Sequence, residues 1–226
     1  MEIRSMHFVS RVRQRLDDTE LQRNLQRTRG RNAAARLASL SSLDDFDAVR
    51  ARATDIRASV LRDLDLWLER FEAEATRRGA TVLWARDGDE ACRLVIDIAR
   101  RHDVKTVVKA KSMVSEEAGL NAALEAAGIR PVETDLGEYI LQINDNEPPS
   151  HIIMPVIHKS KEQVSELFAR VHGTAAKTDI VELTREAREK LRPEFLGAEM
   201  GISGGNFLIA ETGSVAIVTN EGNGRM

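Results

Sequence analysis

The 226-residue sequence has little of several features that would mark a specialised class of protein. Its one cysteine, Cys92, excludes an internal disulfide and any cysteine-ligated zinc or iron–sulfur centre held by this chain alone. No apolar run approaches the roughly 18 to 20 residues that a membrane-spanning helix needs. With 14 Gly and 5 Pro, the chain is neither collagen-like nor low-complexity. We therefore expect a globular protein with no membrane as its partner, and 42% hydrophobic residues suffice to bury a core.

The start of the sequence is rich in arginine. Its first residues lack the apolar core of a secretory signal, and Asp17, Asp18 and Glu20 come too early for a transit peptide, so we expect a cytoplasmic location. Residues 1–36 carry nine Arg against four acids, a balance that could suit nucleic acid or an acidic partner. Acids interleave, however, and Phe8 is the one aromatic residue in this segment. A solvated helix face is therefore favoured, and nucleic acid is not an expected partner.

Helical periodicity dominates the first 79 residues. Between Asp45 and Gly79 apolar residues recur every three or four positions, which predicts one long helix with Asp44 and Asp45 in its first turn and Gly79 at its end. The leucines further upstream form a weaker pattern, with Gly30 as a predicted break. Residues 1–79 are thus expected to form a helical extension that packs on the main domain.

From residue 80 short β-branched runs alternate with helical stretches. The expected strands are TVLWA (81–85), TVVKA (106–110), RPVET (130–134) and HIIMP (151–155). A later helix is expected over 179–192, stopped near Pro193, and NFLIA and SVAIVT predict a hairpin within the sheet. The alternation predicts an α/β fold over 80–226, with a mostly parallel sheet and flanking helices.

Polar residues follow the predicted strands, where open α/β sheets bind their ligands. Lys109 and Lys111 share a face in extended geometry, and two neighbouring ammonium groups suit a carboxylate or a phosphate. Ser112 is placed to begin a helix beside them. The alternative is that one lysine pairs with Glu133 or Asp135 on the neighbouring strand.

Three further features of the sequence bear on its chemistry. Glu211, between two apolar strands, is either an exposed turn acid or a working nucleophile or general base. GISGGN lacks both the GxGxxG spacing and a preceding strand, so it is a weak dinucleotide signature. The five histidines show no metal-ligand spacing, and only His158 is expected near the crevice.

Several long segments, taken in order, resemble a known family. VVKAKSMVSEEAGLNAALEAAGI, VETDLGEYILQI, HIIMPVIHKSKEQVSELF and LRPEFLGAEMGISGGNFLIAETGSVAIVTNEGNGR are similar to the LUD-domain family, iron–sulfur subunits of the bacterial lactate-utilisation system. The resemblance covers about residues 105–225. It implies a fold like that of the sugar-phosphate isomerase, ribose-phosphate isomerase and CoA-transferase group. It also implies a complex with other lactate-utilisation subunits that oxidises L-lactate to pyruvate.

The family's proteins continue past NEGNGR into a ferredoxin-like region whose cysteine clusters hold [4Fe-4S] centres. Because this sequence has only Cys92, we expect the N-terminal portion of such a protein, a LUD domain truncated at its C-terminal end, holding no cofactor of its own and inactive alone.

The resemblance also implies a set of site residues. Glu211 is the catalytic candidate, and no residue is expected to bind a metal. A small carboxylate or phosphate ligand is expected to contact residues near the strand ends: Lys109, Lys111, Ser112, Asp135, Thr212, Asn220, Glu221 and Asn223. Two alternatives stay open: an isomerase-like or CoA-transferase-like enzyme using Glu211, and a non-catalytic assembly module whose Arg-rich helices dock a partner subunit.

Overall fold

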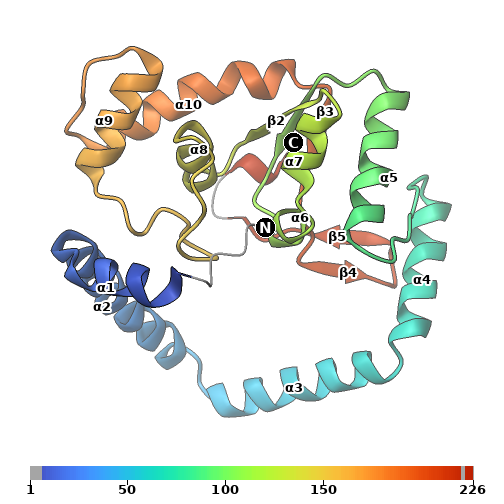
Figure 1. The fold of residues 1–226 in the computed structure, drawn as a ribbon. Helices are drawn as coiled ribbons and strands as arrows, with labels where there is room; N and C mark the ends of the chain where they lie inside the picture. The colour runs from blue at the N-terminus through green and yellow to red at the C-terminus, as the bar shows by residue number, and fades with distance from the viewer. Residues whose placement is uncertain (1–6, 220–221, 226) are drawn as a thin grey trace. The chain divides into compact units, whose positions relative to one another are not determined.

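The computed structural model describes residues 7–219 and 222–225, which divide into two compact units (Figure 1). The first unit contains residues 84–204, the described residues before 26 and those after 218. The second unit contains residues 26–83 and 205–218.

The first unit is built on a three-stranded parallel sheet. Its strands are β1 (Thr106–Lys109), β2 (Arg130–Glu133) and β3 (Met200–Ile202), in the order β2-β1-β3. In this register Lys109 lies opposite Glu133 on β2 and opposite Ile202 on β3. The predicted α/β class, with a mostly parallel sheet and flanking helices, is confirmed.

Helices cover both faces of this sheet. They are α5 (Gly88–Arg101), α6 (Met113–Glu117), α7 (Leu120–Ala126), α8 (Leu136–Ile143), α9 (Lys161–His172) and α10 (Ile180–Gly197). Because side chains alternate along a strand, Val107 packs with α5 and α7, whereas its neighbour Val108 packs with α8, α9 and α10. Figure 1 shows α5 and the α9–α10 pair on opposite sides of the sheet. The sheet is thus buried on both faces, as parallel sheets require.

Two predicted strands are absent from the described part of the chain. TVLWA (81–85) has no regular structure, and its Leu83 and Trp84 side chains are exposed. HIIMP (151–155) forms turns, in which the ring nitrogen Nδ1 of His151 accepts hydrogen bonds from two backbone N–H groups, those of Ile153 and Met154. Both runs are β-branched and apolar, but neither is paired with a strand, so composition alone was misleading.

Two more predictions fail near the end of the first unit. Helix α10 continues through Pro193 to Gly197, since Pro193 removes only one backbone donor close to the helix end. Buried Leu191 and the ion pair between Glu194 and Arg130 fix the helix on either side of the proline. The GISGGN segment, expected to have no strand beside it, begins inside β3 (Met200–Ile202), and its last four residues follow that strand.

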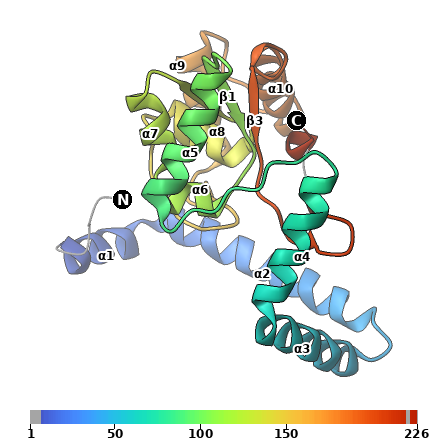
Figure 2. The same ribbon diagram turned by 90° about the vertical axis from the view of Figure 1, so that its right-hand side faces the viewer.

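The N-terminal region is helical, as expected. It contains α1 (Phe8–Asp17), α2 (Thr19–Ser41), α3 (Phe46–Arg62) and α4 (Leu64–Arg77), and α2 runs unbroken through Gly30. The predicted single helix from Asp45 to Gly79 is two helices, α3 and α4, which Figure 2 shows at an angle to each other. Asp63 lies at the break with φ of −118° and ψ of 37°, outside helical geometry. The Asp45 carboxylate caps α3 by accepting from the Ala48 N–H group at 2.9 Å.

The second unit also holds the predicted hairpin. Its strands, β4 (Phe207–Ile209) and β5 (Ser214–Ala216), pair antiparallel as a sheet of their own. The hairpin is therefore confirmed, whereas its membership of the parallel sheet is not. Gly213 in the turn has a φ of +63°, and a Cβ there would lie 2.3 Å from the backbone nitrogen of Ala75 at the end of α4. Only glycine allows this close approach between hairpin and helix.

Candidate functional site

The candidate site lies at the carboxyl ends of the parallel strands of the first unit. The backbone oxygen of Lys109, at the end of β1, accepts hydrogen bonds from the Thr134 N–H group at 3.0 Å and the Thr134 hydroxyl at 2.6 Å. On the other side, the Ala110 N–H group donates to the Ile202 oxygen at 2.8 Å. The segments that leave the three strands are thereby held side by side, in the position where such sheets bind ligands.

Charged side chains and one amide, from five elements or their connecting segments, gather around this edge. We call them the carboxyl-edge cluster: Lys109, Lys111, Glu116, Asn121, Glu133 and Glu138. With three carboxylates and two ammonium groups, the cluster favours holding a proton.

Lys109 is the buried centre of the cluster. Its side chain is only 1% exposed, and its ammonium group lies 2.7 Å from Glu133 Oε1 and 2.7 Å from Asn121 Oδ1. The Asn121 amide also donates to Glu133 Oε1 at 2.7 Å, which closes a triangle of polar contacts. Of the two alternatives that the sequence left open, the structure shows the ion pair with Glu133. Lys109 therefore positions its neighbours, and its ammonium is not exposed to a ligand.

Lys111 differs from Lys109 in both burial and pairing. Its side chain is 22% exposed, and its ammonium group lies 3.3 Å from Glu138 Oε1 and 3.2 Å from the Ile153 backbone oxygen. Both distances exceed the ~2.7 to 2.9 Å typical of a charge-assisted hydrogen bond. Each lysine thus has its own carboxylate, and Lys111 is the more exposed of the two.

Glu116 and Glu138 form a carboxyl pair between α6 and α8. Glu138 lies 3.3 Å from the Lys111 ammonium group, and its negative charge disfavours ionisation of Glu116. Burial and the nearby Glu138 raise the pKa of Glu116 to about 7. Burial also raises the pKa of Glu138, although Lys111 opposes this. The pair can therefore gain or lose a proton near neutral pH.

Ser112 and Asp135, both predicted site residues, begin the helices that carry this pair. The Ser112 hydroxyl accepts from the Ser115 N–H group, and the Asp135 carboxylate accepts from the Gly137 N–H group at 3.0 Å. Gly204 passes close to Ser112, since a Cβ at Gly204 would lie 3.5 Å from the Ser112 hydroxyl oxygen. These residues lie at the same edge as Lys111.

The remaining predicted residues come from the end of the sequence. Glu211 is exposed in the β4–β5 turn of the second unit, where the Thr212 hydroxyl donates to Ser214 Oγ at 2.9 Å. Asn220 and Glu221 lie outside the described residues. Asn223 is half-buried in a short 3-10 helix, Gly222–Gly224, of the first unit. A role for these residues in one site with the lysines stays a prediction.

Sequence reasoning missed Glu116, Asn121 and Glu138 as site residues. Glu116 and Glu138 follow predicted strands, which was a usable signal, but their meeting depends on how α6 and α8 pack. Asn121 sits in the middle of a helical pattern and carried no signal of its own.

Two other polar groupings of the first unit are structural. His158 lies between Ser150 Oγ at 2.7 Å and Glu147 Oε1 at 3.1 Å, and burial lowers its pKa although Glu147 opposes this. Buried Glu186 accepts from His172 at 2.8 Å, Thr174 at 2.7 Å and Lys177 at 2.5 Å. Burial opposes ionisation of Glu186, but these hydrogen bonds prevail and lower its pKa to about 2.

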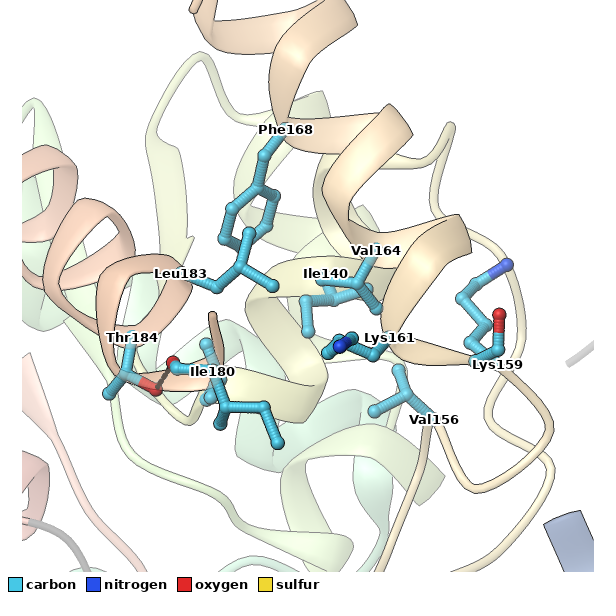
Figure 3. Close-up of a pocket in the computed structure, with 11 residues that line it drawn as sticks. Ile140, Val156, Lys159, Lys161, Val164, Phe168, Ile180, Leu183 and Thr184 are labelled. Carbon is cyan, nitrogen blue, oxygen red and sulfur yellow. Dashed lines mark hydrogen bonds between the residues drawn. The ribbon is translucent and has the colours of Figure 1, made fainter. Parts of the chain in front are cut away.

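A pocket of about 240 Å³ lies between α8, α9 and α10. Figure 3 shows Ile140, Phe168 and Leu183 around it, and the Lys159 ammonium group directed away from it. That ammonium pairs with Glu147 at 2.6 Å. The pocket is lined mainly by apolar side chains and by none of the predicted ligand residues.

Within 7–219 and 222–225, no three His, Cys, Asp or Glu side chains are grouped so that they could hold a metal ion. None of the helices in the same ranges is both long and apolar enough to cross a membrane.

Comparison with known proteins places this fold in a family. Residues 68–226 match the LUD domain, and the chain therefore belongs to the LUD-domain family. It is 44% identical over 223 residues to lactate utilization protein B of Geobacillus kaustophilus, which covers 99% of this chain and 47% of the relative. It is 42% identical over 226 residues to the protein of that name from Bacillus licheniformis, covering 100% of this chain and 47% of the relative.

A relative with a different name is similar to the same extent. The uncharacterized electron transport protein YkgF of Escherichia coli is 42% identical over 219 residues, covering 97% of this chain and 46% of the relative. The chain thus spans about half the length of the curated relatives it matches. No solved structure matches it.

Proposed function

We propose that this chain is the LUD-domain part of a cytoplasmic electron-transport subunit in bacterial oxidation of L-lactate to pyruvate. The similarity over nearly the whole chain to lactate utilization protein B and to YkgF supports this assignment. Because the sequence holds one cysteine, [4Fe-4S] clusters would belong to other parts of the full-length protein, and the other lactate-utilisation subunits would be its partners.

Within that function, the carboxyl-edge cluster binds a small carboxylate, with Lys111 as the cation that receives it. The supporting observation is the contrast between the two lysines. Lys109 is buried and held by two short hydrogen bonds, whereas Lys111 is partly exposed and loosely held. A loosely held ammonium group beside the strand ends can exchange its protein partners for a ligand carboxylate at small cost.

The test is growth on L-lactate of a host that lacks its own homologue and carries the full-length protein. Lys111→Ala should abolish growth on lactate but not on glucose, at equal protein abundance. Lys105→Ala is the matched control, because Lys105 is an exposed lysine directly before β1, and the strain that carries it should grow normally. Unimpaired growth of the Lys111→Ala strain would overturn the assignment of Lys111.

A further inference from the structure

The carboxyl pair of Glu116 and Glu138 faces charged groups from every element around it. Burial and the charges of Glu138 and Glu133 raise the pKa of Glu116, and the charge of Lys109 opposes this. Burial raises the pKa of Glu138; Lys111 opposes this, and the charges of Glu133 and Asp135 add to it. Asp135 is committed to the N-terminus of α8, where it accepts from the backbone.

Among these neighbours only one cation can change its partner without unfolding the site. Lys109 is fixed by Glu133 and Asn121, each at 2.7 Å. Lys111 contacts Glu138 at 3.3 Å and reaches partly to solvent. When Lys111 turns to a ligand carboxylate, Glu138 loses the cation that favours its ionised form.

The loss has a defined electrostatic consequence. Glu138 is 7% exposed, so without Lys111 its negative charge would lie buried beside Glu116 and Glu133. A proton taken up by Glu138 or by the neighbouring Glu116 removes that charge, since burial disfavours two ionised carboxylates beside each other.

We propose that binding of a small carboxylate at Lys111 is coupled to uptake of a proton by the Glu116–Glu138 pair. This inference rests on the proposed function, because it takes Lys111 as the ligand's partner. In the coupled step the Lys111–Glu138 ion pair breaks, a Lys111–ligand ion pair forms, and a proton from solvent joins the carboxyl pair. The ligand's negative charge and the proton's positive charge enter together, so the site's net charge is unchanged.

The pKa of Glu116 sets the pH range in which ligand affinity should depend on pH. Burial and Glu138 raise the pKa of Glu116 to about 7, so at about pH 8 the unliganded pair has mostly lost its proton. Ligand affinity should therefore fall as the pH rises from about 7 to 9, by up to roughly tenfold per pH unit when a whole proton is taken up.

The experiment is isothermal titration calorimetry of the chain with L-lactate at about pH 8, in HEPES and in Tris. L-Lactate stays ionised at this pH, so any proton is taken up by the protein. The buffers differ in ionisation enthalpy, and the difference in apparent binding enthalpy gives the number of protons. We expect about half to one proton for the chain.

Two variants assign the proton. Glu116→Gln keeps a hydrogen-bonding side chain without a titrating group, so it should bind L-lactate with equal heats in both buffers. Glu117→Gln alters the exposed neighbour on α6 and should retain the buffer dependence of the parent.

The outcomes separate the two proposals. Binding with equal heats in both buffers by the unaltered chain would overturn the proton coupling and leave the carboxylate site standing. Proton uptake retained in Glu116→Gln would overturn the assignment to this pair. A chain that binds no L-lactate at millimolar concentration would overturn the coupling and the carboxylate site together.

Discussion

The buried ion pair between Lys109 and Glu133 should hold the first unit together. Lys109→Met removes one partner and leaves the carboxylate of Glu133, whose side chain is 7% exposed, without its cation. Breaking a buried pair in this way costs roughly 3 to 5 kcal/mol. Asn121 still donates to Glu133 at 2.7 Å, so we expect the lower end, about 3 kcal/mol.

Replacing both partners should cost much less than replacing one. Lys109→Met with Glu133→Leu leaves no buried charge, and such exchanges are often close to neutral. We expect the double variant to lie within about 1.5 kcal/mol of the parent protein, with a coupling of about 2 kcal/mol between the positions. Lys105→Met, at an exposed position directly before β1, is the matched control and should change stability by less than about 0.5 kcal/mol.

The assay is urea unfolding followed by the fluorescence of Trp84 in a Trp67→Phe background. Trp84 belongs to the unit that holds the ion pair, whereas Trp67 belongs to the other unit. The reasoning is refuted if Lys109→Met alone costs less than about 1 kcal/mol, or if the double variant is as unstable as the sum of the two single ones.

Two further predictions concern stability. The folded-state pKa of Glu186, about 2, lies below its ordinary value, so its stabilising effect is present above about pH 4.5 and is lost as the pH falls towards 2. Glu186→Gln should therefore cost about 2 kcal/mol at pH 7 and much less at about pH 2.5 in thermal unfolding; an equal cost at both values would contradict this. In the second unit, Gly213→Ala places a Cβ against the backbone of Ala75, and should cost at least about 2 kcal/mol. Gly79→Ala also has a positive φ but meets open space, and should cost only about 1 kcal/mol; equal costs in urea unfolding would remove the steric argument.

Local structure could be predicted from the sequence where it depends on residues that are adjacent in the chain. The strands at 106–109 and 130–133 and the cap at Asp45 follow from β-branched runs and from a carboxylate before a helix. The errors arise where packing decides. HIIMP resembles a buried strand but is a turn, and α10 continues through Pro193 because contacts on either side fix it.

The candidate site likewise contains one contact that the sequence made foreseeable and one that depends on packing. The parallel register made pairing of Lys109 with Glu133 a foreseeable alternative, because both end neighbouring strands. The pair of Glu116 and Glu138 depends on two helices meeting beyond the sheet, which no spacing in the sequence encodes. Burial then sets the proton affinity of that pair, and burial is a property of the folded chain.

Binding of a small carboxylate at Lys111 is tested most directly by NMR titration of the isotope-labelled chain with L-lactate, with neutral lactamide as the matched ligand. We predict saturable shifts at Lys111, Ser112 and Glu138 with lactate, none with lactamide, and none in Lys111→Ala. Shifts confined to the apolar pocket between α8, α9 and α10, or equal shifts with lactamide, would contradict it.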